Sequence, residues 1–438
     1  MTSTGRAGRL LVAACLAVTA LACWGSLGAE TLQEAWSLAL ARNQALAAAA
    51  ADVDGARAAE QAARGVRWPS LEANGGYTRL NASPTLDVSS PGFTFRSRPI
   101  FKGDEFVSGT VQMKIPLYTG GQISAGIDGA QRTLVGASED EQSAISALKL
   151  DVAEAYVAVL RAHRSLQAAS SSVESLTAHA GDVQHMVERE LVPRSDLLAA
   201  RVALANAEQA RVHAANSVEI AYATYNRRLG EPLGRSPELD ERLPVDAGIP
   251  ITPADTLVQR ALASRSEIKA QAARADALVS QSRAELGKVL PQLALVGSHT
   301  HFDNQILDRQ DFSAVGIGFT WNLFDGGQAR HRAAAARSAS RAAHNRLDDL
   351  RSAIELQVRQ AWLEVQEARA RVKASGEAVA QAEENLRSSR ELYRAGLATN
   401  TQVLDAVTLQ INAVNNRDNA TLDESLSLLR LEYAVATL

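Results

Sequence analysis

The chain contains a long internal repeat. The segment LYTGGQ at 117–122 returns as LFDGGQ at 323–328, and LVPRSDLL at 191–198 returns as LATNTQVL at 397–404. A repeat of this length indicates one structural unit that is used twice, and it constrains the fold more than any single motif. In each copy, a long helical pattern surrounds two short segments of alternating apolar residues. This combination is typical of a barrel with helices attached.

The spacing between the two copies changes at one place only. The offset is 222 residues from Pro69 to Pro291 but 206 residues from Leu117 to Leu323. The first copy therefore carries an insertion between its two alternating segments. Because insertions are tolerated in surface loops, we expect an exposed loop from Asn81 to Asp104.

The composition favours long helices and excludes several functions. The 438 residues are rich in Ala and carry a net charge of -4, without the basic clusters that hold nucleic acid. The two cysteines, Cys15 and Cys23, both lie near the N-terminus, so the body of the chain has no thiol for a disulfide framework. No nucleophile elbow, phosphate loop or HExxH motif is present. We expect no catalytic residues and no cofactor.

Two histidines are spaced as metal ligands on a strand would be. His299 and His301 lie two residues apart, which puts both side chains on one face of an extended segment. Only Asp303, at the edge of a loop, adds a further ligand. We therefore expect no metal site.

The N-terminus has the pattern of an export signal. Arg6 and Arg9 precede an apolar run over 10–22, which is too short to span a bilayer and fits a signal peptide over 1–29. Two outcomes remain open. Cleavage after Ala22 or near Gly28 gives an unmodified chain, whereas a lipoprotein signal over 1–22 makes Cys23 the lipidated first residue.

Four segments alternate between apolar and polar residues, as strands with one apolar face do: 70–80, 107–117, 292–302 and 314–323. In the last segment the apolar residues are Val315, Ile317, Phe319, Trp321 and Leu323. Lengths of about 10 residues, with aromatics near the ends, match the strands of a membrane barrel. The alternative is a soluble β-hairpin on an ordinary core.

Helical patterns fill most of the remaining chain. The segments 122–188 and 328–394 contain no Pro, and their apolar residues recur every three or four positions, so we expect two very long coiled helices. A first helix is expected over 31–67, and returning helices over 196–229 and 402–437. Ser195 and Thr401 stand where an N-cap residue belongs. The Pro- and Gly-rich stretch after Gly230 indicates a linker.

In this order, the repeated motifs resemble those of the TolC-like outer-membrane efflux proteins. PLYTGGQ at 116–122 and NLFDGGQ at 322–328 are similar to that family's strand-to-helix junctions, YRAGLATNTQVLDA at 393–406 to its helix-tip turn, and YNRRLGEPLG at 225–234 to the end of its first repeat. The resemblance implies repeats over 30–234 and 253–438, joined by a linker over 235–252. It implies a mainly helical protomer that gives four strands to a trimeric 12-stranded β-barrel, continued by a long α-helical periplasmic barrel.

The resemblance also implies a periplasmic gate at the tips of the returning helices. Asp196 and Asp405 match the family's gate acids, and Tyr393 matches a gate aromatic. Gln402 and Ala398 stand where a further acid and an Arg are often found, so fewer ionic contacts are expected here. The alternative for Asp196 is that it only helps to begin a helix beside Ser195.

The exposed tips are implied to meet a periplasmic adaptor protein. The tip residues are Glu190, Leu191, Gly396 and Leu397. Apolar residues at the ends of solvated helical hairpins can serve as anchors. The same pattern also fits a helix C-cap with its hydrophobic contact, for which Gly396 and Leu397 qualify.

Together with the export signal, the resemblance implies a passive exit duct in the outer membrane of a Gram-negative cell, with most of its mass in the periplasm. It would serve a tripartite efflux pump or a type I secretion system, as a homotrimer with an adaptor protein, an inner-membrane transporter and outer-membrane lipid as partners. No nucleic acid partner is expected. The alternative is a periplasmic coiled-coil scaffold or adaptor that has no membrane barrel.

Overall fold

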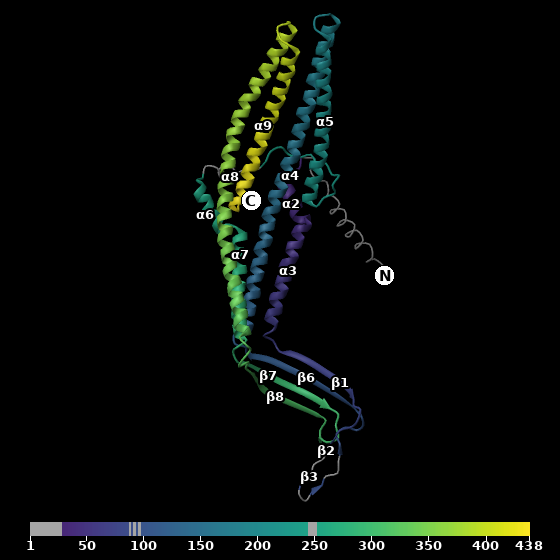
Figure 1. Cartoon of the computed structure of the whole chain (residues 1–438), viewed down its shortest axis with the longest axis vertical. Coiled ribbons are helices and arrows are strands. Elements are labelled where there is room, and N and C mark those ends of the chain that lie inside the picture. Colours follow the sequence, from purple (N-terminus) through teal and green to yellow (C-terminus); the bar gives the residue numbers. More distant parts are fainter. Residues whose placement is uncertain (1–28, 87–88, 91–92, 95–97, 244–251) are drawn as a thin grey trace, which may run out of the picture. The chain divides into compact units, whose positions relative to one another are not determined.

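A computed structural model describes residues 29–86, 89–90, 93–94, 98–243 and 252–438 (Figure 1). The export signal with Cys23, part of the inserted loop and part of the linker lie outside the described residues. The chain forms two compact units, and each unit takes segments from both repeats. The tip unit comprises the chain up to Gln44, Ser146–Ala254 and Arg359–Leu438, and the sheet unit comprises Ala45–Ile145 and Asp255–Val358.

The sheet unit contains one antiparallel sheet of four strands. The strands are β1 (Ser70–Arg79), β6 (Glu105–Tyr118), β7 (Gln292–Phe302) and β8 (Asp311–Thr320), and their order in the sheet is β1-β6-β7-β8. The central pair, β6 and β7, joins the first repeat to the second, and the Thr110 and Thr300 hydroxyls meet across it at 3.3 Å. The two outer strands, β1 and β8, each lack a second neighbour among the described residues.

The register of the strands confirms the predicted apolar face. Leu71 pairs with Met113, Met113 with Gly297, and Gly297 with Val315, so these side chains lie on one side of the sheet. Val315 and Ile317 are 80% and 69% exposed, which a sheet in water would not favour. The last predicted strand is displaced, because β8 begins at Asp311 and ends at Thr320, before Trp321 and Leu323.

The inserted loop has some regular structure. Two short antiparallel ladders pair β2 (Thr85–Leu86) with β5 (Arg98–Pro99) and β3 (Ser89–Ser90) with β4 (Phe93–Thr94). At its base, the Phe101 and Phe106 rings stack with centroids 4.1 Å apart, and Phe302 packs edge-on against both. The aromatic cluster closes the end of the sheet that is remote from the helices.

Helices continue from the strands in the sheet unit. They are α3 (Gln44–Gly65), α7 (Ser266–Gly287), and the N-terminal parts of α4 (Gln122–Glu188) and α8 (Gln328–Arg394), with α6 (Ala254–Ser264) before α7. Small residues let α7 and α8 approach closely, since the Ser282 hydroxyl donates to the Ala333 carbonyl at 3.1 Å and the Ser340 hydroxyl to that of Ala275 at 3.3 Å. The two long helices begin and end as the sequence predicts.

The tip unit contains two helical hairpins. One joins the C-terminal part of α4 to α5 (Arg194–Leu229), and the other joins that of α8 to α9 (Asn400–Val435). A short helix, α2 (Leu32–Arg42), begins with a capping box between Thr31 and Glu34. The single helix predicted over 31–67 is wrong, because α2 ends at Arg42 and the extended backbone of Asn43 breaks the pattern. The Asn43 side chain donates to the Arg228 carbonyl.

The chain just before α2 is fixed by a polar cluster. Glu30 forms a β-bridge with Leu239, and its carboxylate accepts hydrogen bonds from the Tyr225 hydroxyl and the Arg235 guanidinium. The Tyr156 hydroxyl lies 2.7 Å from the Glu30 carbonyl and 2.7 Å from the Asp240 carbonyl. Burial raises the pKa of both tyrosines, so they stay neutral donors. We name Glu30, Tyr156, Tyr225 and Arg235 the Glu30 cluster.

The helix tips as a candidate gate

Both hairpins turn through the same backbone motif. After α4, the Leu191 amide donates to the Met186 carbonyl and the Glu190 amide to that of Val187; after α8, Leu397 and Gly396 donate to Leu392 and Tyr393 in the same way. These bonds define a Schellman motif, which needs a left-handed residue at its turn. Gly396 supplies it with φ 71°, whereas Glu190 adopts φ 59° as a non-glycine residue.

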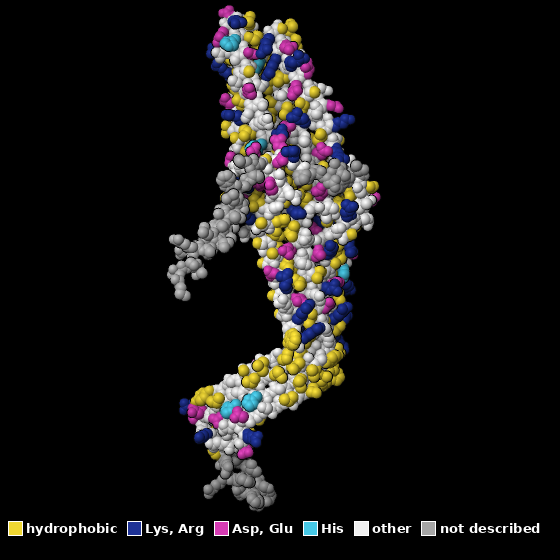
Figure 2. Space-filling model, turned by 180° about the vertical axis from the view of Figure 1, so that it is seen from behind, with side chains coloured by type: hydrophobic (Ala, Val, Ile, Leu, Met, Phe, Trp, Pro, Cys, Tyr) yellow, Lys and Arg dark blue, Asp and Glu magenta, His cyan; other side chains and the backbone are white. Residues whose placement is uncertain are grey.

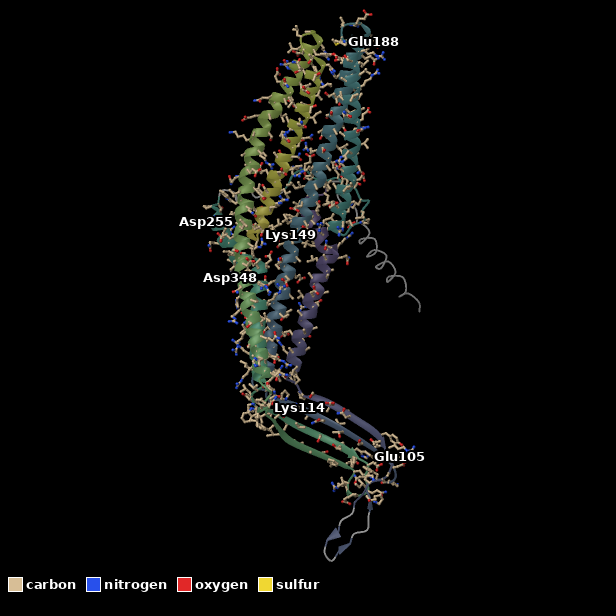
Figure 3. The ribbon with its side chains drawn as sticks, viewed as in Figure 1. Glu105, Lys114, Lys149, Glu188, Asp255 and Asp348 are labelled. Atoms are coloured by element: carbon tan, nitrogen blue, oxygen red, sulfur yellow. The ribbon has the colours of Figure 1, made fainter. Side chains whose placement is uncertain are left out.

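The turn residues leave two apolar side chains in solvent. Leu191 is 66% exposed and Leu397 is 77% exposed, each directly after its left-handed residue. Glu188, on the last turn of α4, marks this end of the first hairpin (Figure 3). The predicted tip residues therefore do lie at the exposed ends of the hairpins.

The predicted N-caps are wrong by two residues in each hairpin. Helix α5 starts at Arg194 after Pro193, which makes no side-chain cap, and Ser195 is already helical. Helix α9 starts at Asn400, where Thr399 and Gln402 form a capping box, so Thr401 is also inside the helix. Gln402, which stands where the family often has an acid, therefore caps the start of its own helix.

The two hairpins meet at the predicted gate aromatic. The Tyr393 hydroxyl donates to the Asp196 carboxylate at 3.2 Å, which joins α8 to the first turn of α5. Tyr393 is only 4% exposed, and its burial, with the nearby Asp196 charge, raises its pKa to about 12. The neutral phenol therefore remains a donor at any physiological pH.

The third predicted gate residue, Asp405, lies apart from this contact. Asp405 is exposed and has no hydrogen bond or ion pair within the described part of the chain. Arg394 pairs with Asp182 at 2.6 Å rather than with Asp196 or Asp405. Of the three predicted gate residues, the structure brings Asp196 and Tyr393 together and leaves Asp405 apart.

A second tie between the hairpins involves a buried histidine that the sequence analysis missed. His179 of α4 lies 2.7 Å from the Asn400 side-chain oxygen, and the Asn400 amide donates to the Asp196 carbonyl at 3.2 Å. Because Asn400 donates through its nitrogen, its oxygen accepts, so His179 carries the proton on Nε2. The signal in the sequence is a lone polar residue between Leu176 and Val183 on the apolar stripe of α4.

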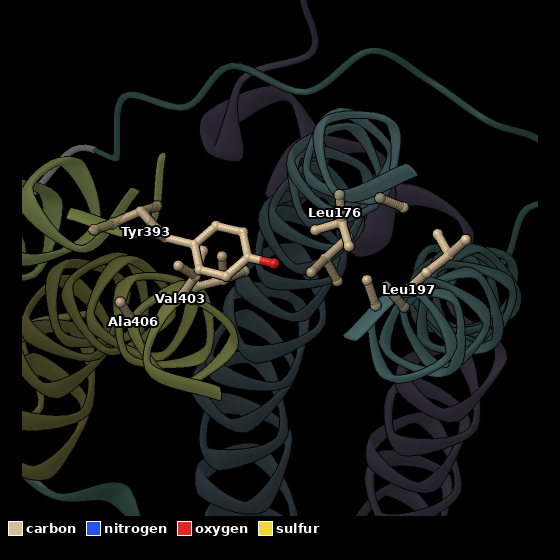
Figure 4. Packing of buried hydrophobic residues seen from close by; sticks show 11 residues of the cluster. Leu176, Leu197, Tyr393, Val403 and Ala406 are labelled. Carbon is tan, nitrogen blue, oxygen red and sulfur yellow. The ribbon is translucent and has the colours of Figure 1, made fainter. Parts of the chain in front are cut away.

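Apolar residues enclose these polar contacts. The surrounding cluster draws on all four helices of the two hairpins and includes Leu176, Leu197, Val403 and Ala406 (Figure 4). The Tyr393 ring points from α8 toward α4, and its centroid lies 5.7 Å from that of the His179 ring. Exclusion of water strengthens each hydrogen bond in the cluster.

Acidification is expected to weaken the His179 tie. Burial is the main reason that the pKa of His179 is lowered, and the Arg390 and Arg394 charges add to it, although Asn400 and Asp182 oppose it. Below about pH 6.5, His179 takes up a proton more readily in the unfolded chain than in the folded chain. The free energy of unfolding therefore falls as the pH is lowered, by less than about 1.4 kcal/mol per pH unit. The urea midpoint should drop between pH 7.5 and 5, and less so in His179→Gln.

The matched control for this experiment is His185→Gln, which changes an exposed histidine on the same helix. It should keep the pH dependence of the unmodified protein. An equal pH dependence in His179→Gln would show that other groups cause it.

The histidines of the sheet form pairs with side chains of the next strand. His299 Nδ1 lies 3.0 Å from the Ser313 hydroxyl, and His301 Nδ1 lies 2.8 Å from the Asp311 carboxylate. Among the described residues, no three His, Cys, Asp or Glu side chains gather as a metal site would need. In the same part of the chain, no helix is both long enough and apolar enough to cross a membrane.

Comparison with known proteins agrees with this geometry. A family model described as "Outer membrane efflux protein" matches residues 35–231 and 257–437. The chain is 24% identical to the outer membrane protein TolC of Vibrio cholerae over 98% of this chain and 95% of that protein. It is 26% identical to the alkaline protease secretion protein AprF of Pseudomonas aeruginosa, over 76% of this chain and 70% of that protein.

The fold is also that of a solved outer membrane protein. The crystal structure of the outer membrane protein VceC from Vibrio cholerae superposes with a TM-score of 0.77 at 18% identity, over 92% of this chain and 95% of that one. The predicted fold class, with four strands per chain in a barrel and a helical periplasmic part, is confirmed. The matched residues cover both repeats, and the chain belongs to the outer membrane efflux protein family.

Proposed function

We propose that this chain is an outer-membrane exit duct whose periplasmic end is held closed by the contact between Tyr393 and Asp196. The observation that carries the proposal is this hydrogen bond, because it joins the two hairpins of one protomer close to their tips. Separation of the hairpins would have to break it, together with the His179 tie. Closure then rests on a few polar contacts inside an apolar cluster.

The sheet supports a duct made of several copies of the chain. Among the described residues, strands β1 and β8 each have one unpaired edge, and an open edge is not stable in a lipid environment. Pairing β8 of one copy with β1 of the next satisfies both edges, and three copies give the 12-stranded barrel that the family resemblance implies. The scaffold alternative has no need for such an apolar, open-edged sheet.

We assign the opening of the duct to a periplasmic adaptor that docks on the tips. Leu191 and Leu397 offer it two exposed apolar anchors on rigid hairpin turns. The duct itself performs no catalytic step, and the energy for transport comes from an inner-membrane transporter. Cargo choice lies in that transporter.

The test of the gate is single-channel conductance in planar bilayers. Asp196→Asn combined with Tyr393→Phe removes a charge-assisted hydrogen bond worth about 1.5 kcal/mol, which corresponds to roughly a tenfold shift toward the open state. The mean conductance should rise accordingly. Tyr222→Phe is the matched control, since Tyr222 also bonds through its hydroxyl in the tip unit but contacts Pro237. A double variant that conducts like the unmodified protein would refute the gate.

A further inference from the structure

The groove between α7 and α8 in the sheet unit is lined by arginines for which the described residues supply no acidic partner. It has a volume of about 630 Å³, and its charged lining residues are Arg283, Arg337 and Arg341. Arg337 donates only to the Ser282 hydroxyl and Arg341 only to that of Ser338, at 3.3 and 3.1 Å. In the described part of the chain, none of these three arginines forms an ion pair.

Arginines on the other side of α7 behave differently. Arg274 pairs with Asp140, and Arg132 pairs with Asp128 and Asp276, so the charges between α4 and α7 are compensated. In the segment of α8 that lines the groove, no Asp or Glu occurs between Asp325 and Asp348. The groove therefore carries positive charge that no carboxylate of the neighbouring helices compensates within the described residues.

The α8 arginines form one stripe along a single face of the helix. Arg337 and Arg341 are four residues apart, and Arg330 lies seven residues before Arg337, so helical periodicity places all three on the same face. Arg330 is the third residue of α8, directly after the segment that follows β8. The positive charge thus begins where the apolar strands end.

Apolar side chains continue from the sheet to this groove. The Trp321 indole donates to the Val289 carbonyl at 3.2 Å, which places it over the turn between α7 and β7. Arg283 lies four residues before the end of α7, about 6 Å along the helix at 1.5 Å per residue. Leu323 and Phe324, between β8 and α8, are 76% and 86% exposed.

Figure 2 shows the sheet from the side of its apolar face. The face can be identified by the histidines, because the register places His299 and His301 on the same side of the sheet as Val315. In this view the hydrophobic side chains gather on the sheet and at its junction with the helices, and basic side chains lie on the adjoining helices. An exposed Trp at the edge of an apolar band is typical of the interface between lipid tails and headgroups. Arginines just beyond it can extend their side chains to the headgroups.

We propose that the groove formed by Arg283, Arg337 and Arg341 binds the phosphate headgroup of an anionic phospholipid in the periplasmic leaflet of the outer membrane. Guanidinium groups bind phosphate through paired hydrogen bonds, and basic pockets between helices next to a membrane suit anionic headgroups. The Ser282 and Ser338 hydroxyls already hold two of the guanidinium groups in place. The acyl chains would lie along the apolar face beside Trp321 and Phe324.

The experiment is a lipid titration of the purified full-length protein, followed by native mass spectrometry. The probes are phosphatidylglycerol, which is anionic, and phosphatidylethanolamine, which has no net charge. The double variant Arg337→Gln and Arg341→Gln should lose about tenfold or more in affinity for phosphatidylglycerol. The matched control, Arg332→Gln with Arg346→Gln, removes two arginines from the same helix outside the stripe, neither of which forms an ion pair within the described residues. It should bind like the unmodified protein.

Three results would overturn the proposal. Equal affinity for the two lipids would show that the groove does not prefer an anionic headgroup. Equal losses of affinity in both double variants would show that only the total positive charge of the helix matters. The third result is that millimolar inorganic phosphate displaces the lipid and that glycerol phosphate binds with the same affinity as the lipid. The groove would then be a site for soluble anions. If the stripe variant does not assemble, Arg283→Gln, which changes only α7, gives the same comparison.

Discussion

Replacing Gly120 with Ala is expected to destabilise the protein much more than replacing Gly326 with Ala, although the two glycines are equivalent positions of the repeat. Both adopt a left-handed backbone, with φ 61° and 68°. An Ala in this conformation costs about 1–2 kcal/mol at either position. The difference between the two variants therefore isolates what surrounds each glycine.

The surroundings differ sharply. A Cβ atom on Gly120 would lie 2.5 Å from the Gly287 carbonyl oxygen and 2.6 Å from Leu290 Cβ, whereas one on Gly326 would meet nothing within 4 Å. Backbone atoms cannot move aside as the end of a flexible side chain can, so overpacking adds about 1–3 kcal/mol or more at Gly120. The end of α7 would have to separate from the start of α4.

Urea unfolding, followed by tryptophan fluorescence, measures this difference. We expect Gly326→Ala to shift the midpoint slightly and Gly120→Ala to shift it by about twice as much or more, with loss of the assembled protein in the severe case. Gly287→Ala should reproduce the severe effect, because its Cβ would lie 2.9 Å from the Gln122 amide nitrogen. Equal midpoints for the two repeat positions would contradict the close approach.

Replacing Glu30 with Ala is expected to cost about 3 kcal/mol of stability in the tip unit. The change leaves the Tyr225 hydroxyl, on a fully buried residue, without an acceptor and removes the ion-pair partner of Arg235. Glu30→Gln retains an oxygen acceptor for Tyr225 and should cost clearly less. The measurement is again the urea midpoint, with a mass determination to show that the N-terminus is processed normally.

An exposed pair nearby serves as the control for the Glu30 experiment. Glu241 pairs with Arg164, and its side chain is 64% exposed. Solvent screening limits such a pair to about 0.2–1 kcal/mol, so Glu241→Ala should change the midpoint little. If Glu30→Ala is as mild as Glu241→Ala, the Glu30 cluster does not hold the N-terminal segment.

The length of the long helices was predictable because two copies of one pattern agree. Both contain no Pro, and both α4 and α8 have 67 residues, with the bounds that the sequence indicates. The first residues of the helices at the tips were not predictable, because several Ser and Thr residues there could serve as the N-cap. In α5 the N-cap is Pro193, which makes no side-chain hydrogen bond. The break at Asn43 was missed because its neighbours are strong helix formers.

The candidate gate was only half predictable for a different reason. Tyr393 and Asp196 follow from the resemblance of the tip turns, but their contact with each other joins residues 197 apart in the chain. The tie between His179 and Asn400 spans 221 residues, and no local pattern in the sequence connects these two positions. Contacts between hairpins depend on how the helices pack. Periodicity predicts which face of each helix is buried, but not which residues of the other hairpin it contacts.

The pairing of β6 with β7 has a consequence for the order in which the chain folds. Each helical hairpin is made of neighbouring segments, so it can form before distant parts of the chain meet. The centre of the sheet cannot form so early, because Thr110 pairs with Thr300 of the second repeat. Closing so long a loop is entropically costly. We therefore expect the hairpins to form first and the centre of the sheet last, once both repeats are present to supply its two central strands.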